Sequence, residues 1–256
     1  MSPIGESVSE GPEQTLLQHL NELRIRLTWA AVGLVGATIV SFLFAEPLLN
    51  FLLMPYARSI PGGAQLQTLR PTEGLETFFK VSLLSGAIIA MPIILYQFWL
   101  FIVPGLTQSE RRYVYVFIPS ALLLFGLGIA FAWFVLVPAA VLFLANFLPE
   151  VFKTEWQSQE YISFLITMLF WIGVSFEMPV VIYFVARLGL VTATTLREQW
   201  RIAIVAIAVI AAAITPSIDP VTMLLTMAPL ILLYGLSIVL AVIGQRQFER
   251  AMSVEA

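Results

Sequence analysis

Six stretches of this chain are almost free of charge, and they constrain the fold more than any other feature of the sequence. A hydrocarbon layer about 30 Å thick is crossed by roughly 20 apolar residues in an α-helix, because each residue adds about 1.5 Å. Most of the stretches reach that length, and only Glu177 interrupts the fourth. In chain order they are Leu27–Ala45, Val81–Ser109, Tyr113–Pro149, Tyr161–Ala186, Ile202–Ile218 and Pro220–Gln245.

The composition agrees that these stretches lie in a membrane. Charged residues make up 11% of the chain and hydrophobic residues 59%, whereas soluble domains carry about 25% and about 45–50%. So little charge cannot cover a water-soluble surface, which excludes a soluble enzyme, a disordered chain and a nucleic-acid-binding protein. Helices are expected because a bilayer leaves backbone polar groups no water to bond. We therefore predict an all-α, polytopic integral membrane protein with six transmembrane helices.

Proline-containing turns help to place the ends of the predicted spans. Glu46–Pro47 ends the first span, Val103–Gly105 ends the second, and Val137–Pro138 ends or kinks the third. The fifth span is short, so it must thin the bilayer locally or lie inside the bundle. The prediction is one membrane domain over residues 1–256, with a cytoplasmic tail and interfacial helix over 1–26 and spans at about 27–45, 75–102, 113–138, 160–186, 200–216 and 221–243.

The positions of Lys and Arg predict which side of the membrane each loop faces. Six spans place both termini on one side, and that side holds nine of the thirteen basic residues. Since loops rich in Lys and Arg stay in the cytoplasm, both termini are predicted to be cytoplasmic. The nine are Arg24, Arg26, Arg111, Arg112, Arg187, Arg197, Arg201, Arg246 and Arg250, and the four on the outer side are Arg58, Arg70, Lys80 and Lys153.

The residue types present argue against catalysis and metal binding. The chain has no cysteine and one histidine, His19, which excludes thiolate and multi-histidine metal sites. An intramembrane protease needs a base beside its serine or histidine ligands for a metal, and His19 precedes the first span. No phosphate-binding glycine loop occurs. We predict no enzymatic activity, no cofactor and no metal, and the net charge of −3 predicts no nucleic-acid partner.

Glu177 is the charged residue that lies deepest in a predicted span. It is 16 residues from Tyr161, or roughly 24 Å along a helix, which places it in the cytoplasmic half of the membrane. A carboxyl group there costs about 2.5–3.5 kcal/mol on insertion scales, so such residues are commonly functional. The alternative interpretation is a protonated glutamic acid bonded to a neighbouring helix.

Two further carboxylates, Glu22 and Glu110, are predicted on the cytoplasmic face. Glu22 lies in an amphipathic segment, Leu16–Leu27, whose arginines explain membrane anchoring but not the glutamate. Glu110 can instead favour the N-terminal dipole of the third span. Two carboxylates can each bind a guanidinium in bidentate fashion, at about 1.5–3 kcal/mol for each charged hydrogen bond. Two such hydrogen bonds contribute roughly 3–6 kcal/mol of binding free energy, which is less than a micromolar affinity requires. A ligand would therefore also need apolar contacts.

Six motifs follow one another in order along the chain. They are His19–Leu27, Arg70–Glu73, Met91–Pro104, Ser109–Arg112, Ser175–Pro179, and Thr215–Pro216 with Ala228–Pro229. Together they resemble the TatC family, the core subunit of the twin-arginine protein translocase, and the resemblance extends from about Leu16 to Gln245.

The resemblance implies a receptor for signal peptides that carry two consecutive arginines. It makes Glu22 and Glu110 the acidic partners of those arginines, with Arg24, Gln97 and Phe101 lining the same cytoplasmic site. It implies export of folded proteins across the bacterial cytoplasmic membrane, driven by the proton-motive force. The implied partners are single-helix TatA and TatB subunits docked on the fifth and sixth spans, membrane lipid, and further copies of the chain in a receptor complex.

The resemblance also implies a cupped bundle with short fifth and sixth helices. Glu177 would face its concave wall, and Pro55, Glu73 and Asp219 would be functional residues of the outer loops. Asp219 is displaced relative to the family pattern, in which Thr-Pro-Pro-Asp is soon followed by Ser-Gln. Considered without the resemblance, Glu73, Glu76 and Lys80 at the outer start of the second span favour a structural role, because Glu76 and Lys80 form an i,i+4 pair.

Two other interpretations stay open from the sequence. A small-solute or ion transporter could use Glu177 as its coupling carboxylate. That reading requires more polar residues facing Glu177 from other spans, and the chain offers mainly Gln97, Thr167, Thr215 and Thr226. A purely structural scaffold is the second alternative.

Overall fold

The computed structural model describes residues 12–59, 66–102, 108–148, 156–215 and 219–255. Within these ranges the chain is helical apart from short turns and one isolated backbone pairing, between Gln67 and Gln157. The helices are α1 (Pro12–Leu43), α2 (Ala45–Ser59), α3 (Glu73–Ile102), α4 (Gln108–Phe131), the π-helical turn η2 (Ala132–Leu136), α5 (Val137–Ala145), α6 (Ser158–Ser175), α7 (Met178–Arg187), α8 (Ala193–Glu198), α9 (Trp200–Ile214) and α10 (Pro220–Glu255).

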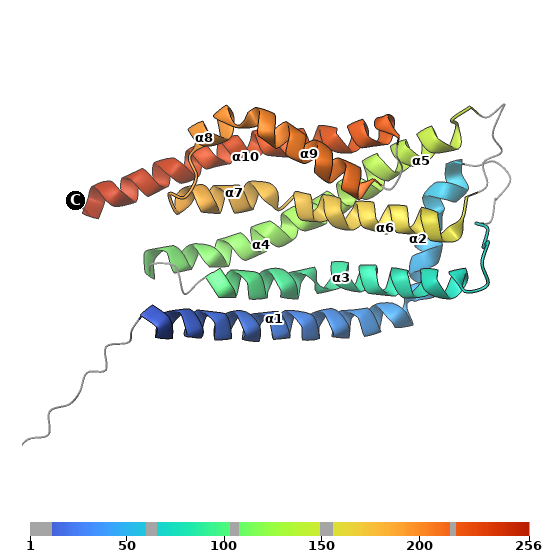
Figure 1. Ribbon diagram of the computed structural model, residues 1–256, viewed down its shortest axis with the longest axis horizontal. Helices are drawn as coiled ribbons and strands as arrows, with labels where there is room; N and C mark the ends of the chain where they lie inside the picture. The colour runs from blue at the N-terminus through green and yellow to red at the C-terminus, as the bar shows by residue number, and fades with distance from the viewer. Residues whose placement is uncertain (1–11, 60–65, 103–107, 149–155, 216–218, 256) are drawn as a thin grey trace, which may run out of the picture.

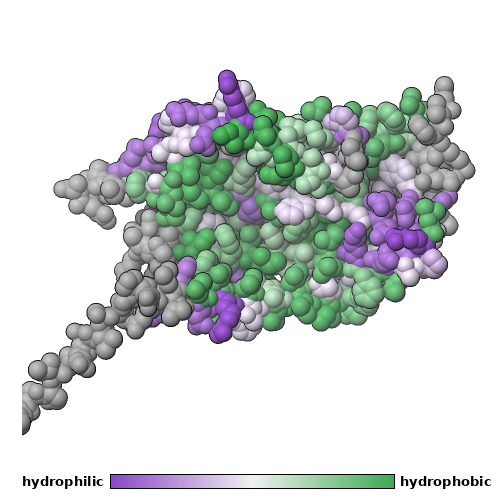
Figure 2. All heavy atoms as spheres, in the orientation of Figure 1, coloured by the Kyte–Doolittle hydropathy of each residue, from purple (hydrophilic) through white to green (hydrophobic). Residues whose placement is uncertain are grey.

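The helices of the described residues form six passes along the long axis of the bundle (Figure 1). The passes are α1, α3, α4 with η2 and α5, α6 with α7, α9, and α10, and α2 lies across one end. In the described part of the chain, five passes are long and apolar enough to cross a membrane, and α9 is shorter. Hydrophobic side chains fill the middle of the surface in Figure 2, and hydrophilic ones gather toward its two ends. The predicted all-α membrane fold is confirmed.

The start of α1 and the end of α10 lie at the same end of the bundle (Figure 1). The loop after α7 and the start of α4 are at that end too, whereas α2 and the starts of α3 and α6 are at the other. This grouping agrees with the predicted division into a cytoplasmic end and an outer end.

Two helix ends differ from the sequence prediction. The third span does not end at residue 138, because α5 continues the pass to Ala145. Pro138 lacks a backbone N–H, and the helix absorbs that loss in η2, where the Val137 N–H bonds to the Ala132 oxygen five residues back. The sixth helix is not short: α10 has 36 residues, since no Gly or Pro stops it in its polar C-terminal part.

The first outer loop and the amino-terminal segment also hold more helix than expected. The segment after Glu46 is not a loop but the helix α2, which contains Pro55. The predicted interfacial helix over residues up to 26 is the first part of α1, which runs unbroken over 32 residues into the first span.

The fifth helix is short, as predicted, and lies at the surface of the bundle. It has 15 residues, or about 22 Å of rise. Its large side chains at Ile202, Val205 and Val209 are more than half exposed. Burial inside the bundle, one of the two expected solutions, is therefore not seen, and local thinning of the bilayer stays a prediction.

Helix α6 is central to the core. Its side chains at Leu165, Ile166, Met168 and Ile172 are almost fully buried and belong to one cluster with residues of α2, η2, α5, α9 and α10. Because α6 is covered on most sides, it fixes the relative positions of the other passes.

Helix α1 is held differently, by close packing of small residues against α3. A Cβ atom added at Gly86 would lie 2.6 Å from the Cα of Thr38, closer than real contacts allow. Ala37 and Ser41 are buried in the same contact, whereas most of the remaining α1 surface is exposed. Small residues let two membrane helices approach closely enough for van der Waals packing to join them.

We predict that Gly86→Leu loosens α1 from α3. Overpacking costs about 1–3 kcal/mol, and here the obstacle is the backbone of Thr38 rather than a movable side chain. Unfolding of the purified protein by denaturant in detergent should show that loss. The matched control is Gly36→Leu, since an added Cβ there meets nothing within 4 Å. Equal destabilisation by both substitutions would contradict the close-packing explanation.

Candidate functional site

The cytoplasmic end of α1 packs beside the end of α3. The rings of His19 and Phe101 are stacked there, with centroids 4.5 Å apart and planes 30° from parallel. Phe101 is a predicted site residue, whereas the sequence prediction gives His19 no place in the site. The signal that could have found His19 is its place one helical turn before Glu22, which puts both side chains on one face of α1.

Glu22 is partly exposed on that face. Its carboxylate lies 3.4 Å from the guanidinium of Arg26, and the two side chains are 26% and 30% exposed. An ion pair at this exposure contributes about 0–1 kcal/mol, so an incoming cation can replace Arg26 at little cost. Arg24 is exposed and donates to the Asn21 side-chain oxygen at 3.0 Å.

Gln97 lies one turn before Phe101 on α3 and so shares its face. Its Oε1 is buried and has no hydrogen-bond partner among the residues that the structure describes. The indole N–H of Trp99, two residues further along α3, is also buried and has no hydrogen-bond partner among the described residues. Buried polar atoms are nearly always bonded, so the unpaired Gln97 oxygen could accept a hydrogen bond from a ligand donor.

Of the five predicted signal-peptide residues, Phe101 contacts α1 through His19, Glu22 and Arg24 follow His19 within two turns of α1, and Gln97 precedes Phe101 by one turn of α3. That these four form one binding site stays a prediction. The fifth, Glu110, lies in the first turn of α4, at the same end of the bundle (Figure 1). Its side chain is outside the described part of the structure, so its role stays a prediction.

Glu177 occupies the break between α6 and α7. The pass is interrupted there because Pro179 cannot donate a backbone hydrogen bond, and α7 restarts at Met178. The Glu177 side chain is only 7% exposed, and its Oε1 has no partner within the described ranges. The alternative interpretation was a carboxyl group hydrogen-bonded to a neighbouring helix. Within the described ranges no such partner for Glu177 is present.

At the outer end, Glu73 is the hub of a hydrogen-bond network. Its side chain is fully buried at the first position of α3. The carboxylate accepts five hydrogen bonds from two segments far apart in the sequence: from Leu69 N (2.8 Å), Arg70 N (3.3 Å), Gln157 Nε2 (2.9 Å), Ser158 Oγ (2.8 Å) and Gln159 N (3.2 Å). All five partners are donors, so the arrangement requires an ionised carboxylate.

Further contacts fasten the same outer segments together. Gln67 donates its backbone N–H to the Trp156 oxygen at 3.0 Å and accepts from Ser158 N at 2.9 Å. The Tyr161 hydroxyl donates to the Leu52 oxygen at 3.0 Å and accepts from Tyr56 N at 3.2 Å, which ties α2 to α6. The contacts of Glu73 are thus those of a structural residue.

The other two predicted outer residues have distinct positions. Pro55 lies within α2 and borders a groove between that helix and α5. Asp219 precedes α10, and its Oδ1 accepts from the backbone N–H of Thr222 at 2.6 Å. That geometry is an N-terminal helix cap, for which aspartate before a proline is well suited.

The fold and the polar cluster at one end define a class: a multi-pass helical membrane protein with an accessible, incompletely bonded surface at its cytoplasmic end. Comparison with known proteins narrows that class. Residues 18–229 match the profile of the family described as Sec-independent protein translocase protein (TatC). The chain belongs to the TatC family.

Several relatives and a solved structure support the assignment. The chloroplastic TATC of Pisum sativum is 35% identical over 91% of this chain and 65% of its own length, so the chain spans about two thirds of that relative. The TatC of Koribacter versatilis is 37% identical over 88% of this chain and 83% of its own. A crystal structure titled as the twin arginine translocase receptor TatC shares 37% identity and a TM-score of 0.82, covering 89% of this chain and all of that one.

These comparisons confirm the prediction of a multi-pass membrane component of a protein translocase over that of a small-solute transporter. They place the chain in a family of translocase components, which is not a known enzyme family.

We predict that Glu73→Gln opens the outer end of the bundle. The amide would turn an N–H group toward donors that now bond to a carboxylate oxygen, leaving buried groups unsatisfied. The melting temperature should fall, and backbone hydrogen exchange at residues 67–70 and 157–159 should accelerate. The control is Glu76→Gln on the same helix, because Glu76 is exposed and pairs with Arg70 at the surface. Unchanged hydrogen exchange in Glu73→Gln would show that the Glu73 carboxylate is not needed to hold these two segments together.

Proposed function

We propose that this chain is the core component and signal-peptide receptor of a twin-arginine translocase that exports folded proteins across the bacterial cytoplasmic membrane, driven by the proton-motive force. The observation that carries the proposal is the cluster at the meeting point of α1 and α3. It combines an exchangeable carboxylate, Glu22, with the stacked rings of His19 and Phe101. A bacterial relative and a structure titled as the receptor agree with this function.

The chemistry of the cluster suits an arginine-containing peptide. A guanidinium can bond a carboxylate through two parallel N–H donors and stack on an aromatic face, whereas an ammonium is a point charge. Glu22 offers the carboxylate, and the Gln97 oxygen lacks a donor in the described structure. Glu110, one helix away on α4, is proposed as the partner of the second arginine.

Apolar contact with membrane helices supplies the remaining affinity. Two charged hydrogen bonds contribute roughly 3–6 kcal/mol, which is less than the roughly 8 kcal/mol of a micromolar complex. The apolar segment of a signal peptide can lie along the exposed part of α1 and α3, where Leu23, Leu27 and Phe98 are exposed.

We further propose that single-helix TatA and TatB subunits dock on α9 and α10, and that several copies of the chain assemble in the receptor complex. In support, α9 presents an apolar face to its surroundings, formed by Ile202, Val205, Val209 and Ile210. A helix only 15 residues long would thin the bilayer around such partners.

The first test compares two peptides. Glu22→Gln should weaken binding of a signal peptide with two arginines by about ten- to a hundredfold, since one charged hydrogen bond or pair is lost. A peptide with two lysines should lose less, because it does not use bidentate geometry. Fluorescence anisotropy of labelled peptides on the reconstituted protein measures both.

The control for this test is Glu198→Gln, which removes an exposed carboxylate from the same end of the bundle outside the cluster. The double variant Glu22→Gln with Glu110→Gln should abolish specific crosslinking to the two-arginine peptide. Undiminished crosslinking in that variant would refute the receptor assignment.

The second test separates Glu177 from peptide recognition. Glu177→Ala should leave peptide affinity unchanged and reduce export or partner recruitment, because the side chain lies buried in another helix pair. Export of a folded reporter and co-purification of the single-helix subunits are the measurements. A loss of peptide affinity would place Glu177 in the receptor site instead.

A further inference from the structure

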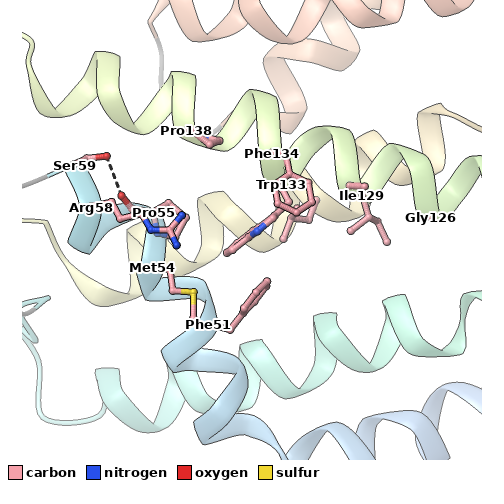
Figure 3. Close-up of a pocket in the computed structure, with 12 residues that line it drawn as sticks. Phe51, Met54, Pro55, Arg58, Ser59, Gly126, Ile129, Trp133, Phe134 and Pro138 are labelled. Atoms are coloured by element: carbon pink, nitrogen blue, oxygen red, sulfur yellow. Dashed lines mark hydrogen bonds between the residues drawn. The ribbon is translucent and has the colours of Figure 1, made fainter.

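A groove separates α2 from the pass formed by α4, η2 and α5 (Figure 3). It encloses about 620 Å³, and Leu169 of α6 forms part of its floor. The π-helical turn shapes one wall: Trp133 stacks on Phe51 of α2 with ring centroids 4.1 Å apart, and Phe134 is 74% exposed. The groove is far from the receptor cluster, since α2 lies at the outer end of the bundle (Figure 1).

The groove has one charged end and apolar walls. Arg58, in the last turn of α2, is the sole charged residue among the side chains that line it. Arg58 is exposed and forms no ion pair or hydrogen bond with the residues that the structure describes. Figure 3 shows Arg58 at the Pro138 end of the groove and Gly126 at the opposite end. Between them lie apolar side chains such as Ile129 and Met54.

The length of the groove matches one leaflet of a bilayer. Gly126 and Pro138 are twelve residues apart along one pass, or about 18 Å. Half of a hydrocarbon core of about 30 Å is about 15 Å. An acyl chain that fills the apolar part would therefore bring its headgroup to the level of Arg58.

We propose that this groove binds one anionic phospholipid of the outer leaflet, with an acyl chain along η2 and α4 and the phosphate on the Arg58 guanidinium. An anionic headgroup is favoured over a zwitterionic one because the groove presents a cation and no carboxylate. One arginine near a membrane surface corresponds to about a fivefold preference for the anionic lipid. The proposal does not rest on the receptor function, because the two sites lie at opposite ends of the bundle.

Trp133 provides a direct probe of occupancy. The purified protein is reconstituted in phosphatidylcholine vesicles that contain a minor fraction of either phosphatidylglycerol or phosphatidylcholine with brominated acyl chains. The fluorescence of the wild type minus that of Trp133→Phe isolates the signal from the groove. We expect brominated phosphatidylglycerol to quench that signal at about one fifth of the concentration that brominated phosphatidylcholine requires.

Arg58→Gln tests the headgroup contact. It should raise the half-quenching concentration of phosphatidylglycerol to that of phosphatidylcholine. Arg70→Gln is the matched control, since Arg70 is an exposed outer arginine that does not line the groove. Equal quenching by the two lipids in the wild type, or an unchanged preference in Arg58→Gln, would overturn the proposal.

Gly126→Leu tests the acyl-chain contact. An added Cβ at Gly126 meets nothing within 4 Å, so the larger side chain fills the deep end of the groove rather than distorting the helix. Quenching of Trp133 by both lipids should fall. The matched control is Gly235→Leu on α10, where an added Cβ also meets nothing within 4 Å. This control should leave the quenching of Trp133 unchanged. Full quenching in a folded Gly126→Leu protein would overturn the proposed position of the acyl chain. If that variant does not fold, the comparison of Arg58→Gln with Arg70→Gln decides the question.

Discussion

A helix that crosses a hydrocarbon layer must satisfy its own backbone hydrogen bonds, and the architecture of this chain depends on that constraint. Breaks in such a helix are costly, so their positions are informative. Among the described helices, two passes are interrupted: at η2, next to Pro138, and at Glu177, next to Pro179. The first interruption shapes the groove beside α2. The second forms the turn that carries the buried carboxyl group of Glu177. Proline thus creates local features in an otherwise regular bundle without ending either pass.

The two ends of the bundle differ in how firmly their carboxylates are bonded. At the outer end, the Glu73 carboxylate and the Tyr161 hydroxyl join α2, α3 and α6 through direct hydrogen bonds. At the cytoplasmic end, the Glu22 carboxylate has a weak surface partner and the Gln97 oxygen has none in the described structure. The Glu73 carboxylate is thus fixed by its neighbours, whereas the Glu22 carboxylate can exchange its weak partner for a ligand.

The sequence predicts the features that depend on local pattern. Six apolar stretches and the short α9 follow from hydropathy, and the described part of the structure has them. The orientation follows from the positions of the arginines and stays a prediction. The structural role at the start of α3 was predicted, but the partners of Glu73 could not be, because Gln157 and Ser158 are 84 and 85 residues away. The stack of His19 on Phe101 is hidden for the same reason. The length of α10 was missed because hydropathy marks where the membrane ends, not where the helix ends.

The groove and the Glu177 turn share one wall, which connects the outer half of the protein to its interior. On α4, Ile129 faces the groove, while the adjacent Gly128 lies against Phe176: an added Cβ there would be 2.8 Å from that ring. Phe131, at the end of the same helix, contacts the Phe176 ring with centroids 5.7 Å apart. Closely packed interiors transmit displacement instead of absorbing it. A shift of α4 that widened or closed the groove would therefore also displace the turn that positions Glu177.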